Sequence, residues 1–279
     1  MKIHCAKLVM ILLLWPMIAS GQEIEFSRFL PPIALQKSID NAAYLAKALQ
    51  KMSDAADFSS NLIETRLFLY RELKQLTHYH NRLPCSLSAE PESILWLSSG
   101  QLIRVYLIYN ALKNGDLVEQ IAGIIDRYKE GDFFEPGGLG LIEDGQIVLE
   151  PLPSDPWPRT PGTESVYIIP EEGLKRQFIF LFHLHPLSTS GPLTGPSWSV
   201  KIDKNTREAK LGNDIGATLS WADDFGDSHH LLISKMYNRA FNVDYYSAEK
   251  QVYPPVTGVL DYCPRLKGFK IVDLGKWSY

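Results

Sequence analysis

The spacing of apolar residues changes near Gly131, and this change limits the chain to helices followed by strands. Before this point, apolar side chains recur every three to four residues, as they do in amphipathic helices. Beyond it, short apolar runs alternate with turn signals, which is typical of strands. Helices are expected over residues 38–52, 58–80, 92–115 and 116–132.

The segment after Gly131 has the pattern of an α/β domain. Asp144-Gly145 lies between two apolar runs and predicts a hairpin over residues 138–153, because this dipeptide suits a two-residue turn. Residues 177–186 are apolar enough for a strand that is buried on both faces. Further strand segments are expected over residues 198–212, as a second hairpin, and over 229–236 and 267–275.

The N-terminus has the pattern of a secretory signal. Lys2, His4 and Lys7 precede a short apolar run over residues 8–19, and small residues follow it. This run is too short for a comfortable membrane span. Residues 1–21 are therefore expected to be a signal peptide. The mature protein is expected to be secreted or periplasmic, with no stable membrane span after cleavage.

Composition and cysteine content limit the partners and the redox chemistry. The 279 residues are 45% hydrophobic and 22% charged with a net charge of −4, which is ordinary for a globular protein and does not favour nucleic acid as a partner. After signal cleavage only Cys85 and Cys263 remain. In an oxidising compartment they either form a disulfide or stay as two separate thiols. The sequence leaves both open, as it does the oligomeric state.

Two histidines interrupt the apolar strand over residues 177–186. His183 and His185 are two residues apart, so both project from the same face of a strand. Two imidazoles on one face can bind one metal ion, and Zn²⁺ is the first choice for nitrogen and carboxylate ligands. Alternatively, they are half-buried side chains that hydrogen-bond to their neighbours. His78 and His80 would face apart on a helix, so a shared metal is not expected there.

A carboxylate and a second motif accompany the histidine pair. Glu135, then H-x-H-P at residues 183–186, then S-x-x-D from Ser220 to Asp223, resemble in this order the JAMM motif of the MPN-type metalloprotease and isopeptidase family. The resemblance covers roughly residues 131–246. It implies that residues 131–279 form a cytidine-deaminase-like α/β domain with a mixed central sheet. Together with the helical domain over 22–130 that the apolar spacing predicts, this makes an α+β protein.

The resemblance also implies a site and an activity. His183, His185 and Asp223 would hold Zn²⁺. Glu135 would be the acid and base, and Ser220 would stabilise the oxyanion. The protein would then be an exported zinc-dependent metalloprotease or isopeptidase that hydrolyses an amide bond in a protein or peptide substrate.

The chain departs from the family pattern between the two motifs, where residues 187–219 form an unusually long spacer. The earlier segment from Ser197 to Val200 begins like the expected motif, but valine stands where aspartate is required. Asp203 is a rival ligand, and residues 195–218 are interpreted as largely an inserted hairpin. The acid–base role has rivals too: Glu143, Glu150, Glu164, Glu171 and Glu172.

Two other functions remain open from the sequence. MPN-like domains can lose their metal, so the chain could be a catalytically inactive scaffold or protein-binding module. It could also be a helical interaction protein whose C-terminal domain is only structural. Metal content separates these possibilities from the enzyme.

Overall fold

The computed structural model describes residues 62–79, 83, 87, 89–127, 135–152, 178–187, 191–202, 209–250, 266 and 268–279. Several predictions fall outside these residues: the signal peptide, the helix over 38–52, both cysteines of the mature chain, Asp203, and the rivals Glu164, Glu171 and Glu172. Among the helices that are described, none combines the length and the apolar character needed to cross a bilayer.

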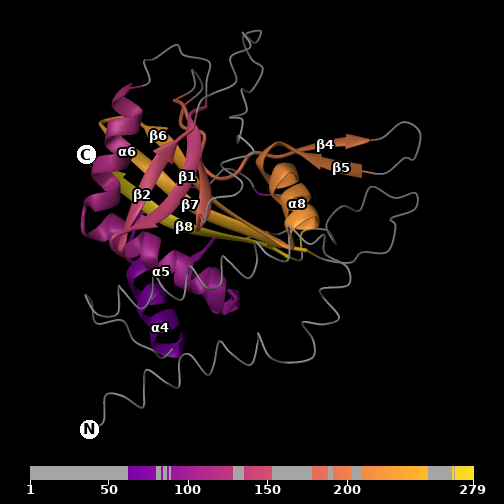
Figure 1. Cartoon of the computed structure of the whole chain (residues 1–279), viewed down its shortest axis with the longest axis horizontal. Helices are drawn as coiled ribbons and strands as arrows, with labels where there is room; N and C mark the ends of the chain where they lie inside the picture. Colours follow the sequence, from indigo (N-terminus) through magenta and orange to yellow (C-terminus); the bar gives the residue numbers. More distant parts are fainter. Residues whose placement is uncertain are drawn as a thin grey trace.

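A six-stranded sheet forms the centre of the described structure, in the order β2-β1-β3-β6-β7-β8 (Figure 1). Its strands are β1 Gly137–Glu143, β2 Gln146–Pro151, β3 Phe180–His185, β6 Asp227–Met236, β7 Ala240–Glu249 and β8 Phe269–Ser278. β3 and β6 are parallel, and the other neighbours are antiparallel. The expected combination of helices with a mixed central sheet is therefore confirmed.

Three helices and a short 3-10 helix pack on one face of this sheet. They are α4 Leu62–Leu73, η1 Pro91–Trp96, α5 Ser99–Lys113 and α6 Asp116–Arg127. Their apolar side chains join those of Phe180, Phe182 and Leu184 from β3 in the largest hydrophobic core. The N-terminal helices and the sheet thus bury their apolar surfaces against each other.

The single helix expected over residues 92–115 is two elements, η1 and α5. The 3-10 helix ends at Trp96, and Ser98 caps the start of α5: its hydroxyl accepts from the Gln101 backbone N–H, and the Gln101 side chain accepts from the Ser98 backbone N–H. This reciprocal capping box satisfies two amide groups that a helix start leaves unpaired. The chain can therefore turn at Ser98 without burying unpaired amides.

The opposite face of the sheet is covered by α8 Asn213–Phe225, which the sequence analysis did not predict. Ile215 and Ala222 of α8 pack with Leu232 of β6 and Tyr246 of β7 in a second core. The sheet consequently lies between two layers, with α8 on the side away from α5 and α6 (Figure 1).

A small antiparallel hairpin interrupts the connection from β3 to α8. β4 Ser199–Ile202 pairs with β5 Ala209–Gly212, which confirms the hairpin expected over residues 198–212. Its base is closed by the Ser199–Gly212 pair, one residue before α8 begins. In Figure 1 the hairpin projects beside α8, away from the central sheet.

Asp273 links the segment after α4 to the sheet through hydrogen bonds. This carboxylate on β8 is only 1% exposed. Its Oδ2 accepts from the Tyr79 backbone N–H at 3.0 Å and lies 3.3 Å from His78 Nδ1, and this interaction raises the pKa of His78. Its Oδ1 accepts from Asn242 Nδ2 and from the Gly275 backbone N–H. A buried charge is tolerated here because hydrogen bonds surround it.

Glycine at position 138 is required by the close approach of β1 to its neighbours. A Cβ there would lie 2.0 Å from the carbonyl oxygen of Glu150 and 2.8 Å from the Phe182 ring. Because the carbonyl belongs to paired backbone, we expect Gly138→Ala to lower the free energy of unfolding by about 1–3 kcal/mol. Gly123→Ala is the matched control, since a Cβ at this helical position meets nothing within 4 Å.

The control should raise the free energy of unfolding by about 0.5–1 kcal/mol, because glycine inside a helix costs backbone entropy. Urea denaturation of the two variants measures both effects. Equal stability of the two variants would contradict the strand packing described here.

Candidate metal centre

β3 places two imidazoles side by side on the face of the sheet that α8 covers. Alternation along the strand sends Phe180, Phe182 and Leu184 into the core on the other face. His183 and His185 are 4% and 3% exposed, and their Nε2 atoms are 3.4 Å apart. The expectation that the two rings project together is confirmed.

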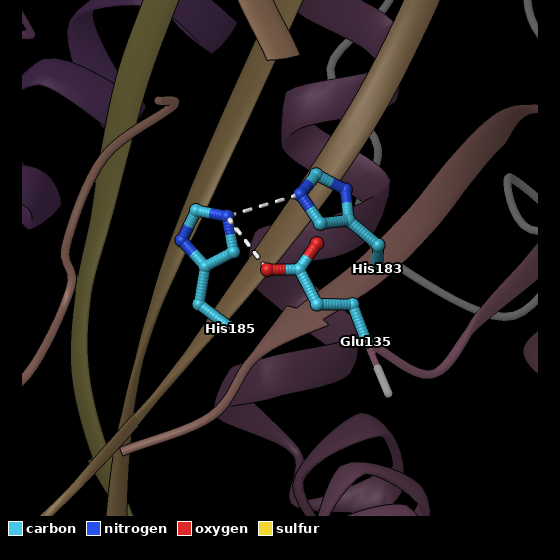
Figure 2. A group of neighbouring side chains, drawn as sticks. All are labelled: Glu135, His183 and His185. Atoms are coloured by element: carbon cyan, nitrogen blue, oxygen red, sulfur yellow. Dashed lines mark hydrogen bonds and ion pairs between the residues drawn. The ribbon is translucent and has the colours of Figure 1, made fainter. Parts of the chain in front are cut away.

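Glu135 joins the histidines through the pairing of β1 with β3. Gly137 pairs with His183 in this antiparallel register, and the Leu184 N–H donates to the Pro136 carbonyl at 2.8 Å. Glu135 therefore falls opposite His185, with its Oε1 4.0 Å from His185 Nε2. Figure 2 shows its carboxylate pointing toward both rings. One ligand atom from each of the three residues lies within 4.8 Å of the others.

A second carboxylate, Asp214, reaches the histidines from the first turn of α8. Its Oδ1 is 3.3 Å from His183 Nε2, and its Oδ2 is 3.2 Å from His185 Nε2. Acidic side chains are favoured in the first turn, because the amide dipoles of a helix leave positive charge at its N-terminus. The two rings and Asp214 come from elements on either side of the inserted hairpin.

These distances are compatible with one metal ion held by bonds of about 2 Å. Zn–N and Zn–O bonds of about 2.0–2.1 Å place neighbouring tetrahedral ligands roughly 3.3–3.4 Å apart. The two imidazole Nε2 atoms are 3.4 Å apart, and each lies 3.2–3.3 Å from a different oxygen of the Asp214 carboxylate, Oδ1 for His183 and Oδ2 for His185. Glu135 lies farther from His185, at 4.0 Å. We therefore assign the two histidines and Asp214 as candidate ligands and Glu135 as a neighbouring carboxylate.

The protein environment favours positive charge at this place. Burial favours the neutral imidazole of His185 and so lowers its pKa. The hydrogen bond and the charge interaction with Asp214 outweigh this effect, and Glu135 and the Leu193 carbonyl add to them, so that the pKa of His185 is raised to about 9. Burial likewise opposes ionisation of Asp214, but His183 and His185 hold the pKa of this carboxyl well below its usual range. A cation bound here would meet an ionised carboxylate in a water-poor setting.

Two further hydrogen bonds orient the candidate ligands. His185 Nδ1 donates to the Leu193 carbonyl at 3.3 Å, so a metal ion would bind at Nε2, in place of the proton that this nitrogen shares with Asp214. Asp214 Oδ2 accepts from the backbone N–H of Ser197 at 2.7 Å and from its hydroxyl at 2.8 Å. Such contacts fix both the tautomer and the direction of a ligand.

The structure does not bring Asp223 or Ser220, the expected third ligand and oxyanion donor, to the histidines. Both lie on exposed positions of α8, and the backbone carbonyl of Asp223 accepts from Lys250 Nζ. Asp223 follows Asp214 by nine residues on the same helix, or roughly 13 Å along its axis. We therefore replace Asp223 by Asp214 as the third candidate ligand, and Ser220 has no place at the site.

The sequence did carry a signal for Asp214. Ile215, Leu219 and Ala222 follow helical spacing directly after Asn213-Asp214. Acidic residues are common in the first turn of a helix. Recognising a helix here would have placed Asp214 at its start and Asp223 near its end.

The adjacent histidines of β6 face opposite sides of the sheet, as expected for neighbours on a strand. His229 contacts Asp227 at 2.9 Å and the Tyr245 hydroxyl at 2.7 Å. His230 is bonded to the Ser228 hydroxyl at 2.6 Å. Burial and the nearby His183 lower the pKa of His230 to about 3, so this ring is neutral at physiological pH.

The rival glutamates that the structure describes lie away from this centre along the β1–β2 hairpin. Glu143 is the last residue of β1, at the exposed Asp144-Gly145 turn, and Glu150 is in β2, on the far side of β1 from β3. Of the described glutamates, Glu135 is the one placed with the histidines.

Comparison of the chain with protein-family models, with curated proteins and with solved structures finds no match in any of the three.

Proposed function

We propose that this protein is a zinc-dependent hydrolase that cleaves an amide bond in a protein or peptide substrate. Ligand atoms from two separate segments, β3 and the start of α8, support it most directly: the Nε2 atoms of His183 and His185 are 3.4 Å apart, and each lies 3.2–3.3 Å from an oxygen of Asp214. Three protein ligands and one open position are the usual arrangement of catalytic zinc. The two imidazoles and the aspartate would hold the ion.

The chemistry divides between the metal and Glu135. When bound, zinc polarises a substrate carbonyl and lowers the pKa of a coordinated water toward neutrality. The Glu135 carboxylate is 21% exposed and 4.0 Å from His185 Nε2, so it lies beside the ligands without displacing them. We assign it the proton transfer, in which it takes a proton from the attacking water and delivers it to the leaving amine.

The resemblance to JAMM-type metalloproteases supports the same assignment once Asp214 replaces Asp223. Ser197 lies 17 residues before Asp214 in sequence, yet both its N–H and its hydroxyl reach the Asp214 carboxylate. We therefore take Ser197, in place of Ser220, as the serine of the serine–aspartate motif. The β4–β5 hairpin then lies between the serine and the aspartate of the motif rather than ahead of both. With this assignment the order of glutamate, paired histidines, serine and aspartate is kept.

Metal loading and hydrolysis test the proposal together. Protein stripped with a chelator should take up one equivalent of Zn²⁺, and the loaded form should cleave members of a panel of peptide and isopeptide substrates that the stripped form leaves intact. Failure to take up zinc at micromolar free metal would overturn the proposal. Stoichiometric zinc without hydrolysis of any substrate would favour a metal-holding scaffold.

A further inference from the structure

The loop over residues 191–197 contacts two of the three candidate ligands. The Leu193 carbonyl accepts from His185 Nδ1, and Ser197 donates twice to Asp214. The loop lies between β3, which carries the histidines, and the β4–β5 hairpin, which precedes Asp214. Its position therefore controls how the ligands converge.

A buried carboxylate on the sheet holds the middle of this loop. The Gly195 backbone N–H donates to Asp244 Oδ2 at 3.2 Å, and Asp244 is 0% exposed. Gly195 has a φ of 77°, a conformation that glycine adopts readily, so its N–H can turn toward the sheet. The adjoining Thr194 is also buried.

Strand register explains why the Asp244 carboxylate lies beneath the loop. His183 of β3 pairs with Leu232 of β6, and Leu232 pairs with Asp244 of β7. Residues paired across a sheet project from the same face, so Asp244 shares the face of the histidines. Asn242 Nδ2 also donates to Asp244 Oδ2, at 3.2 Å.

We propose that Asp244 is a positioning residue of the metal centre, which fixes the 191–197 loop so that Leu193 and Ser197 orient His185 and Asp214. This inference rests on the proposed function, because it assigns a role toward zinc. A hydrogen bond in a water-poor interior is electrostatically stronger than one in water. Through the bond that its Oδ2 accepts from Gly195, Asp244 therefore restrains the loop more firmly than a side chain without an acceptor could.

The structure offers a matched control in Asp273. Both carboxylates are buried, and both accept from Asn242 Nδ2. Asp273 also accepts from the backbone N–H groups of Tyr79 and Gly275 and lies 3.3 Å from His78 Nδ1, and none of these residues belongs to the loop. Removing either carboxylate disturbs the same buried polar cluster, but only the loss of Asp244 releases Gly195.

The test measures Zn²⁺ affinity by chelator competition and records the visible spectrum of the Co²⁺-loaded full chain, which reports ligand geometry. We expect Asp244→Ala to weaken zinc binding about tenfold and to change the cobalt spectrum, as the loss of a residue that supports a ligand does. Asp273→Ala should retain the affinity and spectrum of the unaltered protein. Asp244→Asn keeps an oxygen acceptor for Gly195, so it should restore most of the affinity.

If Asp244→Ala does not fold, Asp244→Ser takes its place in the test. The serine hydroxyl keeps a polar group at this position but is too short to reach Gly195, so the same loss of zinc affinity is expected. The inference alone is overturned if the Asp244 variants bind Zn²⁺ and Co²⁺ as the unaltered protein does. It is also overturned if Asp273→Ala shows an equal loss. Absence of zinc uptake by the unaltered protein overturns the proposed function itself.

Discussion

Asp214→Ala should weaken zinc binding by more than about a hundredfold, because it removes one of three protein ligands. The loss of a group that merely supports a ligand already costs about 10–100-fold in metal affinity. The variant also leaves His183 and His185 without the carboxylate that lies 3.2–3.3 Å from their Nε2 atoms. Zinc affinity is measured by competition with a chromophoric chelator.

Asp223→Ala is the control for this experiment, since Asp223 lies on the same helix at an exposed position. It should bind zinc with the affinity of the unaltered protein. If Asp223→Ala loses zinc while Asp214→Ala retains it, the ligand set expected from the sequence was right and the assignment made from the structure is wrong.

Glu135→Gln should lower the rate of hydrolysis by about 10²–10⁴-fold while leaving zinc affinity close to normal. The amide has nearly the shape of the carboxylate but cannot accept the proton, and positioned acid–base groups contribute rate factors of this size. Steady-state kinetics on a substrate from the peptide panel, with metal content measured on the same sample, separates the two effects.

Glu143→Gln provides the comparison for Glu135→Gln. Glu143 is exposed at the end of β1, the strand that Glu135 precedes. We expect it to hydrolyse substrate at the normal rate. Full activity of Glu135→Gln would remove Glu135 from the proton-transfer role.

The parts of the site that depend on local pattern could be predicted from the sequence. His183 and His185 lie two residues apart in an apolar strand, and alternation alone puts both rings on one face. The β1–β2 hairpin likewise follows from Asp144-Gly145, both of which have the positive φ that this turn requires. In each case the neighbours that decide the structure are close in the chain.

The third ligand could not be found in this way, because its position depends on contacts between distant segments. Asp214 reaches the histidines only after the β4–β5 hairpin returns the chain to its starting point and α8 packs on the sheet. A motif with fixed spacing favours Asp223 instead, since Ser220 precedes it by three residues.

The sequence analysis did not predict strand β7, because its pattern is not that of a buried strand. It carries Asn242 and Asp244 at fully buried positions, so polar residues stand where a buried strand normally has apolar ones. Hydrogen bonds to Gly195 and between these two side chains help to compensate for the burial. No apolar run marks the strand at these positions.

Because the base of the β4–β5 hairpin is closed, the length of this hairpin could differ between homologous chains. Ser199 and Gly212 are paired directly, so the polypeptide leaves and re-enters at nearly one point. Added or deleted residues between these ends would change the hairpin without moving Ser197 or Asp214 apart. Family patterns written with a rigid gap between serine and aspartate would overlook every chain with such an excursion.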